Sequence, residues 1–150
     1  MSQSLSQIYL HIVYSTKHRK PFLKGDSLLS EVHAYLATTV ANLGCPALLV
    51  GGVEDHVHLL CRFGRGITVP DFIRDQKRAS SSWLKTKPRL RDFQWQSGYG
   101  AFSISPVHIP GLTNYIEDQR EHHQKETYQD EFRRLCKKYG VELDERYAWD

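Results

Sequence analysis

The run "HVHLLCRF" at residues 56–63 constrains the fold of this chain more than any other stretch, because its two faces carry different chemistry. Side chains alternate along a strand, so His56 and His58 lie on one face while Val57 lies on the other. The aliphatic face of such a strand has to be buried against helices. We therefore expect a sheet with one packed face and a second face that carries the two histidines, with Asp55 beside them.

The rest of the chain alternates between strand-like and helix-like segments. The predicted elements are a strand over 7–14, a helix over 27–42, strands over 46–53 and 56–63, a helix over 68–87, a strand over 93–105, and helices over 109–124 and 128–140. Gly44 and Gly140 end two of the helices, because glycine adopts the left-handed backbone of a helix C-terminus without strain. Thr68, Pro70 and Asp71 mark the start of the second helix.

This order of elements predicts an α+β fold of the ferredoxin-like or RRM-like type. Strand, helix, strand, strand, helix, strand is the split βαβ arrangement, in which an antiparallel sheet packs its helices on one face. The other face is then open, and RNA-recognition modules bind nucleic acid on it. A C-terminal helix carries Tyr115. The length of 150 residues suits one domain, which we expect to span residues 1–150.

The composition indicates the cellular compartment of the protein, the role of its cysteines and the charge of its partner. No apolar run approaches the roughly 20 residues of a membrane span, and the N-terminal residues lack a secretion signal, so we expect a cytoplasmic protein without a membrane partner. Cys45, Cys61 and Cys136 are spaced too irregularly for a disulfide framework or a zinc knuckle, and we expect reduced packing residues. The net charge of +3 weakly indicates a polyanionic partner.

Two interpretations of the histidine pair are open at this point. Both rings can reach one metal ion, and the carboxylate of Asp55 is either a ligand or the acceptor that orients a ligating imidazole. Histidines on a sheet face are also often ordinary surface residues. A second group favours a functional site, since Tyr115, Gln119 and His122 are spaced along one stripe of the predicted helix. A phenol is a competent nucleophile when a metal or a base assists its deprotonation.

Taken together, these residues resemble the single-tyrosine HUH transposases, the small enzymes of insertion sequences and REP elements. The resemblance rests on "DHVHLL" and "YIEDQ", and it extends to "HIVYSTKHRKPFL", "VPDFIRDQKRASSSWL" and "WQSGYGAFSIS". A histidine pair alone is a weak signal, whereas the pair followed by a tyrosine helix in this order is a strong one. One departure is that Val53 and Glu54 stand where the family has methionine and proline. The departure alters the turn before the histidines and removes no ligand.

The resemblance implies a metal centre with a nucleophile beside it. His56 and His58 are then metal ligands, with the amide oxygen of Gln119 as the third. Tyr115 is the nucleophile. The ion is Mg²⁺ or Mn²⁺, and the mixture of nitrogen and oxygen donors favours Mn²⁺. The residues expected to support this centre without binding the metal are Asp55 and His122.

The implied function is DNA transposition by strand cleavage and rejoining. Tyr115 attacks a phosphate of single-stranded DNA next to a hairpin and leaves a 5′-phosphotyrosine and a free 3′-hydroxyl. Because the intermediate is still a phosphodiester, a second DNA end rejoins without ATP. A basic stripe is equally compatible with a solvated face. The side chains expected from their charge to contact DNA phosphates are Arg19, Lys20, Arg74, Lys77, Arg78 and Lys85.

The resemblance also implies a homodimer. Family members resemble domain-swapped dimers in which the tyrosine of one subunit completes the site of the other. Pro110 and Gly111 precede the tyrosine and are a candidate hinge for such an exchange, and they are also compatible with an ordinary helix start.

Two other functions compete with this interpretation. A histidine-triad nucleotide hydrolase needs a further histidine at position 60, which is Leu60, so this class is disfavoured. A non-catalytic, domesticated module that binds hairpin DNA or RNA is the main alternative. The presence of all four chemical residues argues against lost activity.

Overall fold

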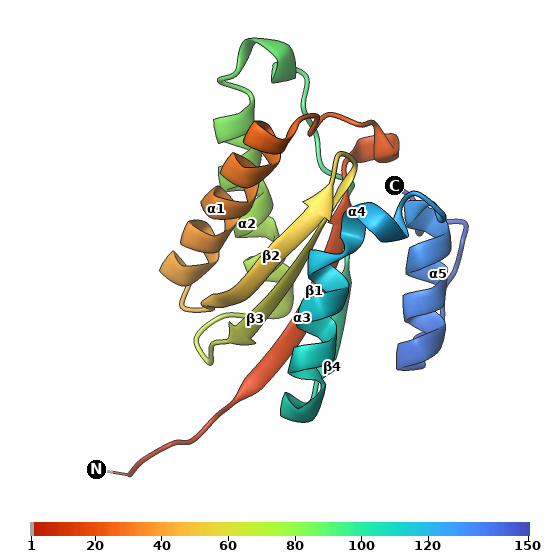
Figure 1. Ribbon diagram of the computed structural model, residues 1–150. Helices are drawn as coiled ribbons and strands as arrows, with labels where there is room; N and C mark the ends of the chain where they lie inside the picture. The colour runs from red at the N-terminus through yellow and green to blue at the C-terminus, as the bar shows by residue number, and fades with distance from the viewer. Residues whose placement is uncertain (1) are drawn as a thin grey trace.

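The computed structural model describes residues 2–150, which form a four-stranded sheet with five α-helices around it (Figure 1). The sheet order is β2-β3-β1-β4, and every neighbouring pair is antiparallel. The predicted ferredoxin-like α+β fold is confirmed. The elements are β1 (Ile8–Ser15), α1 (Asp26–Asn42), β2 (Ala47–Val53), β3 (His56–Phe63), α2 (Val69–Leu84), β4 (Gly100–Ile104), α3 (Ile109–Glu117), α4 (Gln119–His122) and α5 (Tyr128–Tyr139).

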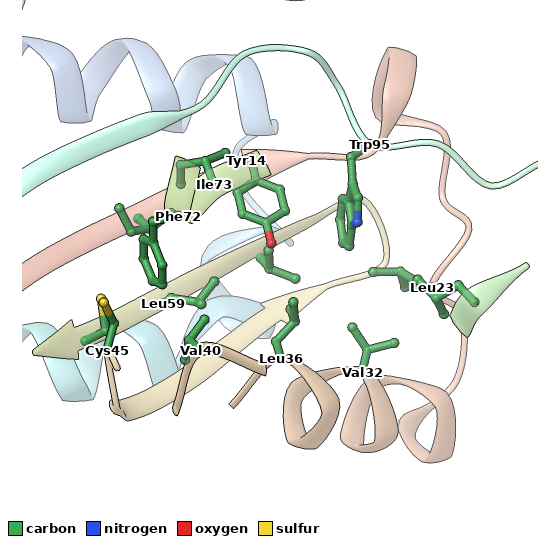
Figure 2. Packing of buried hydrophobic residues seen from close by; sticks show 14 of the residues in the cluster. Tyr14, Leu23, Val32, Leu36, Val40, Cys45, Leu59, Phe72, Ile73 and Trp95 are labelled. Carbon is green, nitrogen blue, oxygen red and sulfur yellow. The ribbon is translucent and has the colours of Figure 1, made fainter. Parts of the chain in front are cut away.

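The main hydrophobic core lies between the sheet and the helices α1 and α2. Alternate residues of the central strands point into it, including Tyr14 of β1 and Leu59 of β3. Figure 2 shows Leu36 and Val40 of α1 and Phe72 of α2 gathered around these strand residues. Burial of each such side chain stabilises the fold by about 1.5–3 kcal/mol before entropy is counted. The alternation predicted for β3 therefore fixes which of its residues belong to the core.

The second face of the sheet, which the fold class led us to expect open, is covered by α3, α4 and α5 (Figure 1). Val13 of β1 and Phe102 of β4 share a buried cluster with Phe132 of α5. Leu60 of β3 is buried with Ile116 of α3. A sheet with apolar residues on both faces has to be covered on both. The histidines of β3 are consequently enclosed between the sheet and the C-terminal helices.

Two predicted elements are shorter in the structure. The strand predicted over 93–105 is confined to β4, because the backbone N–H groups of Ser97 and Gly98 bond to Asp150 instead of a neighbouring strand. The helix predicted over 109–124 is interrupted at Asp118, whose backbone has φ −91° and ψ 16°. Aspartate is a poor helix former, and the break separates α3 from α4.

Several helix boundaries agree with the sequence. Gly44 and Gly140 have the predicted left-handed backbone, with φ of 80° and 70°. Thr68 caps α2, since its hydroxyl oxygen accepts a hydrogen bond of 3.2 Å from the backbone N–H of Asp71. Pro110 lies in the first turn of α3, so the proposed hinge is a helix start in this structure.

Gly51 and Gly100 allow the C-terminal helices to approach the sheet closely. A Cβ atom at Gly51 would lie 2.6 Å from the side chain and 2.9 Å from the carbonyl oxygen of Ile116. A Cβ atom at Gly100 would lie 2.8 Å from the ring of Phe132 on α5. All three distances are shorter than ordinary packing contacts. The two glycines therefore set how deeply α3 and α5 lie on the sheet.

Two expectations from composition can be compared with the structure. Cys45, Cys61 and Cys136 are buried and form no disulfide, as predicted for packing residues. Among residues 2–150, no helix combines the length and the hydropathy that crossing a membrane requires.

Candidate functional site

His56 and His58 project from β3 toward the C-terminal helices, and both side chains are fully buried. Each ring is held through its Nδ1 atom. His56 Nδ1 lies 2.7 Å from Oδ1 of Asp55, and His58 Nδ1 lies 2.8 Å from Nε2 of His11 on β1. These contacts orient both rings and leave the two Nε2 atoms directed at a common centre.

Glu131 of α5 occupies this centre. Its Oε1 atom lies 3.2 Å from Nε2 of His56, 3.1 Å from Nε2 of His58 and 3.0 Å from Nε2 of His123. The carboxylate is fully buried, and a buried charge is costly unless hydrogen bonds and opposite charges compensate it. The imidazoles supply this compensation. Glu131 organises the site, and it is absent from the set predicted from the sequence.

Tyr115 of α3 reaches the same carboxylate from the other side. Its hydroxyl donates a hydrogen bond to Oε2 of Glu131 and accepts one of 2.7 Å from Nη2 of Arg134. Gln119, the first residue of α4, donates through Nε2 to Oε2 of Glu131 at 3.0 Å and accepts through Oε1 from Nε2 of His56 at 2.9 Å. The predicted residues that lie together around this acid are His56, His58, Gln119 and Tyr115.

Protonation in the site follows from these contacts. Burial lowers the pKa of His56, but hydrogen bonds to Asp55 and Glu131 outweigh burial and raise it to about 9. Burial would raise the pKa of Glu131, but hydrogen bonds from His123, His56 and His58 hold it well below its usual range. Burial lowers the pKa of His58. The ionised carboxylate of Glu131 therefore stabilises the protonated form of the His56 imidazole.

The phenol of Tyr115 does not ionise readily on its own. Burial and the carboxylate of Glu131 raise its pKa, and the guanidinium of Arg134 opposes this only in part. Attack by this oxygen needs a group that takes the proton and a cation that stabilises the resulting charge. Glu131 and Arg134 both contact the phenol oxygen, so each is placed for one of these tasks.

A divalent metal ion fits the donor set of His56, His58 and Glu131. One nitrogen of each histidine and one carboxylate oxygen lie within 4.8 Å of one another, so a single ion can contact all three. The partners of the two Nδ1 atoms are contacts of the kind that hold ligating imidazoles in place. Two nitrogen donors and one oxygen donor suit Mn²⁺ better than Mg²⁺, which prefers oxygen.

His122 and His123 flank this centre in different ways. The ring of His122 lies against the ring of Tyr115, with centroids 4.7 Å apart. His123 contacts Glu131 through Nε2 and the backbone oxygen of Glu126 through Nδ1, at 2.9 Å. His122 therefore packs on the expected nucleophile, while His123 holds the buried acid.

The basic residues expected to contact DNA fall into two groups. Lys77 of α2 donates to the backbone oxygens of Gln96 and Gly98 at 2.8 and 2.7 Å. Arg78 and Lys85 are exposed and line a groove of about 750 Å³ between α2 and the segment before β4. Partners within the chain already engage Arg19, Lys20, Arg74 and Lys77.

The residues that sequence reasoning missed left a partial signal. Glu131 lies one turn from both Tyr128 and Leu135, so it falls on the apolar stripe of its helix. A carboxylate on such a stripe is rarely buried unless it is paired. His11 similarly lies among apolar residues of a predicted strand. Arg134 gave no comparable signal, because its helix face is exposed.

Comparisons with known proteins agree on one family. The family model described as "Transposase IS200 like" matches residues 4–119. The ISDra2 transposase TnpA of Deinococcus radiodurans is 25% identical over 121 residues, which make up 77% of this chain and 86% of that protein.

Two solved structures are similar in fold. A candidate transposase from Deinococcus radiodurans R1, known from a crystal structure, has a TM-score of 0.61 and 22% identity over 79% of this chain and 98% of the other. A REP-associated tyrosine transposase bound to a REP hairpin has a TM-score of 0.59 and 12% identity over 82% of this chain and 74% of the other.

The family match contains the histidine pair, Tyr115 and Gln119. It ends before α5, so Glu131 and Arg134 lie outside it. Because the match spans well over half of the sequence, the chain belongs to the IS200-like transposase family.

Proposed function

We propose that the protein is a metal-dependent endonuclease and strand transferase for single-stranded DNA, with Tyr115 as its nucleophile. One observation carries the proposal: the two carboxylate oxygens of Glu131 face the histidine pair on one side and the hydroxyl of Tyr115 on the other. This arrangement would allow a bound cation and the Tyr115 oxygen to act on one phosphate, which supports the proposal. Membership of a transposase family agrees with DNA cleavage and rejoining.

His56, His58 and Glu131 would hold the divalent ion, Mn²⁺ or Mg²⁺, with the amide oxygen of Gln119 as a further candidate. A bound ion would polarise the scissile phosphate and neutralise the charge that develops on it. The hydrogen bond to Asp55 keeps the ring of His56 in its ligating orientation.

In the cleavage step, side chains of the chain supply the nucleophile, the proton acceptor and a stabilising positive charge. The oxygen of Tyr115 attacks phosphorus, and the new O–P bond forms as the bond to the 3′ oxygen of the preceding nucleotide breaks. The phenol proton passes to Oε2 of Glu131 along the existing hydrogen bond and is passed on through water to the released 3′ oxygen, so the carboxylate is ionised again in the covalent intermediate. Arg134 stabilises the negative charge on the phenol oxygen.

The second half of the reaction reverses the first with another DNA end. The 5′-phosphotyrosine retains the energy of the broken phosphodiester, so attack by a 3′-hydroxyl rejoins DNA without ATP. The proton of the attacking 3′-hydroxyl returns to Tyr115 by the same route as the protein is released, and the site is ready for another cycle.

We propose that the site works within one chain. The rings of Tyr115 and His58 of the same chain have centroids 5.9 Å apart, which supports cleavage without a partner's tyrosine. The homodimer with exchanged tyrosines is the alternative. Mixing His56→Ala with Tyr115→Phe protein distinguishes the two, because cleavage in the mixture would require sites completed by a second subunit.

The proposed substrate is single-stranded DNA beside a hairpin. The similar REP-associated tyrosine transposase was solved with a REP hairpin. A centre enclosed between a sheet and helices does not reach a phosphate inside an intact duplex, which favours an unpaired strand. Arg78 and Lys85 are exposed cations that suit the phosphates of the hairpin. An enzyme of this kind would work at the nucleoid, in the cytoplasm.

A covalent-adduct assay tests the proposal. The protein is incubated with Mn²⁺ or Mg²⁺ and hairpin-bearing single-stranded DNA labelled at its 3′ end, and the products are separated on a denaturing gel. We expect the label to migrate with the protein, except with Tyr115→Phe or after chelation of the metal. Tyr147→Phe changes an exposed tyrosine and serves as the control. Binding without any adduct, across many flanking sequences, would instead favour a non-catalytic module for hairpin DNA or RNA.

A further inference from the structure

We propose that the groove between β4, α3 and α5 binds the nucleotides next to the scissile phosphate, with Arg134 and Lys138 as its phosphate contacts. The inference rests on the proposed nuclease function. It assigns a DNA-binding role to α5, which lies outside the family match and on the opposite face of the sheet from the basic residues of α2.

The groove leads to the expected nucleophile. It has a volume of about 760 Å³, which is within the range of sites that hold organic ligands. Its lining includes Ser103 and Ser105 at the end of β4, Gly111 in the first turn of α3, and Tyr115. A strand held here would present its phosphate to the phenol without a large movement of the protein.

Arg134 contacts the reacting oxygen itself. Its Nη2 atom donates to the hydroxyl of Tyr115 and to Glu126, both at 2.7 Å, while Nε faces the same glutamate. A guanidinium has five N–H donors, so these bonds leave the two N–H groups of Nη1 for another acceptor. A phosphate attacked by Tyr115 would bring its free oxygens within reach of this guanidinium.

The charge of the groove suits a phosphodiester. Lys138 follows Arg134 by one helical turn and lines the same groove, as does His108. None of the lining residues in the described part of the chain is acidic. The groove therefore offers two cations in a row along α5, as a DNA backbone requires.

The remaining wall suits unpaired bases. Ile104, Leu112 and Leu135 give it an apolar surface. The ring of Tyr139 lines the groove and is held nearly parallel to Phe102, with centroids 4.6 Å apart. Apolar and aromatic surfaces beside a row of cations are typical of single-strand binding sites, where bases stack without regard to sequence. A duplex does not offer its base faces to such a wall.

Paired substitutions on α5 test the site. The affinity of Tyr115→Phe protein for a fluorescent hairpin-bearing single strand is measured with Mn²⁺ over a range of salt concentrations, so that binding is observed without cleavage. Adding Arg134→Gln or Lys138→Gln should weaken binding about fivefold. Each substitution should also reduce the salt slope, the slope of log binding constant against log salt concentration, by about one in magnitude. Adding Arg133→Gln or Lys137→Gln, exposed neighbours outside the groove, should change neither quantity.

Photo-crosslinking locates the strand directly. Single strands with one 4-thiothymidine at successive positions beside the hairpin are irradiated with Tyr115→Phe protein, and the crosslinked peptides are identified by mass spectrometry. We expect crosslinks to β4 and α5. Crosslinks confined to the groove around Lys85, with binding unaffected by Arg134→Gln and Lys138→Gln, would overturn the proposal. If wild-type protein still forms the adduct, that outcome refutes this binding site alone, whereas loss of the adduct under every condition refutes the nuclease function.

Discussion

The hydroxyl of Tyr115 donates its hydrogen bond to Glu131, 16 residues later in the chain. The bond joins α3, which lies in the matched family region, to α5, which follows it. The other oxygen of the carboxylate faces His56 and His58. One acidic side chain thus connects the expected nucleophile with the cation-binding set, and substitutions around it separate the two roles.

Glu131→Gln should retain the shape of the side chain and remove its charge. An amide accepts no phenol proton and is a weaker metal donor, so adduct formation should slow by about 100-fold or more. Calorimetric titration should also show weaker Mn²⁺ binding. Asp130→Asn changes an exposed neighbour on the same helix and should alter neither measurement. A Glu131→Gln protein with the wild-type rate would exclude this residue as proton acceptor.

Asp55→Asn should weaken metal binding without changing the fold. The carboxylate holds Nδ1 of His56 at 2.7 Å, and loss of such an outer partner typically costs 10–100-fold in metal affinity. We expect a fall of about this size in Mn²⁺ affinity by calorimetry. Glu54→Gln alters the adjacent exposed acid and is the control. Equal affinities in the two variants would show that the ring is oriented by other contacts.

Gly51→Ala should displace the tyrosine helix. The added methyl group would meet both the side chain and the backbone oxygen of Ile116, so α3 has to move away from β2. A misplacement of about 1 Å at a reacting group can cost about 100-fold in rate. Adduct formation should therefore fall steeply while circular dichroism remains that of the wild type. Gly66→Ala places a methyl group in open space and should have full activity.

Without metal, the protein should lose stability as the pH rises from 6.5 to about 9. The pKa of His56 is raised from 6.5 to about 9 in the folded protein. The stabilisation of the fold by protonated His56 is therefore complete below pH 6.5 and is lost as the pH rises through about 9. The full effect corresponds to about 3 kcal/mol. Urea unfolding in EDTA at several pH values measures it.

His56→Gln provides the matching comparison for this pH series. The variant lacks the titrating group, so its stability should change little over the same pH range. Mn²⁺ should reverse the trend in the wild-type protein, because metal binds the deprotonated imidazole. A decline of the same size in His56→Gln would assign the pH dependence to other residues.

Lys77→Ala and Lys85→Ala should separate structural cations from DNA-binding ones. Burial lowers the pKa of Lys77 to about 8, and its ammonium donates to three backbone oxygens ahead of β4. Its loss should cost about 1–3 kcal/mol of stability. Lys85 is exposed, so its substitution should leave thermal unfolding unchanged and lower the salt slope of DNA binding by about one. A loss of stability in Lys85→Ala together with a reduced salt slope in Lys77→Ala would show that Lys85 is the structural cation and Lys77 the DNA-binding one.

The sequence was most informative where short-range rules decide the structure. The alternation on β3 correctly separated His58 from Val57, and Thr68 and Gly140 marked helix ends through their own backbone chemistry. The order of strands and helices then selected the fold. Each of these features depends on residues that are neighbours in sequence or on the period of one element.

The sequence was less informative where distant elements meet. That α5 would return to the sheet depends on the fit of Phe132 against Phe102 and Gly100, which no local pattern contains. The contacts of Glu131 with the histidines and Tyr115 therefore became visible only in three dimensions, and so did the enclosure of the face that was expected to be open. The break at Asp118, directly before Gln119, was hidden by a continuous helical periodicity.

The two-sided character of β3 has a consequence for how this strand can evolve. If its pairing with β1 slipped by one residue, Val57 would enter the polar centre and His58 would enter the hydrocarbon interior, so the core packing and the polar centre would be lost together. A single-residue insertion or deletion in β3 therefore has to be absorbed by a β-bulge if both faces are to keep their side chains. Selection for folding and selection for chemistry act on β3 as a single constraint.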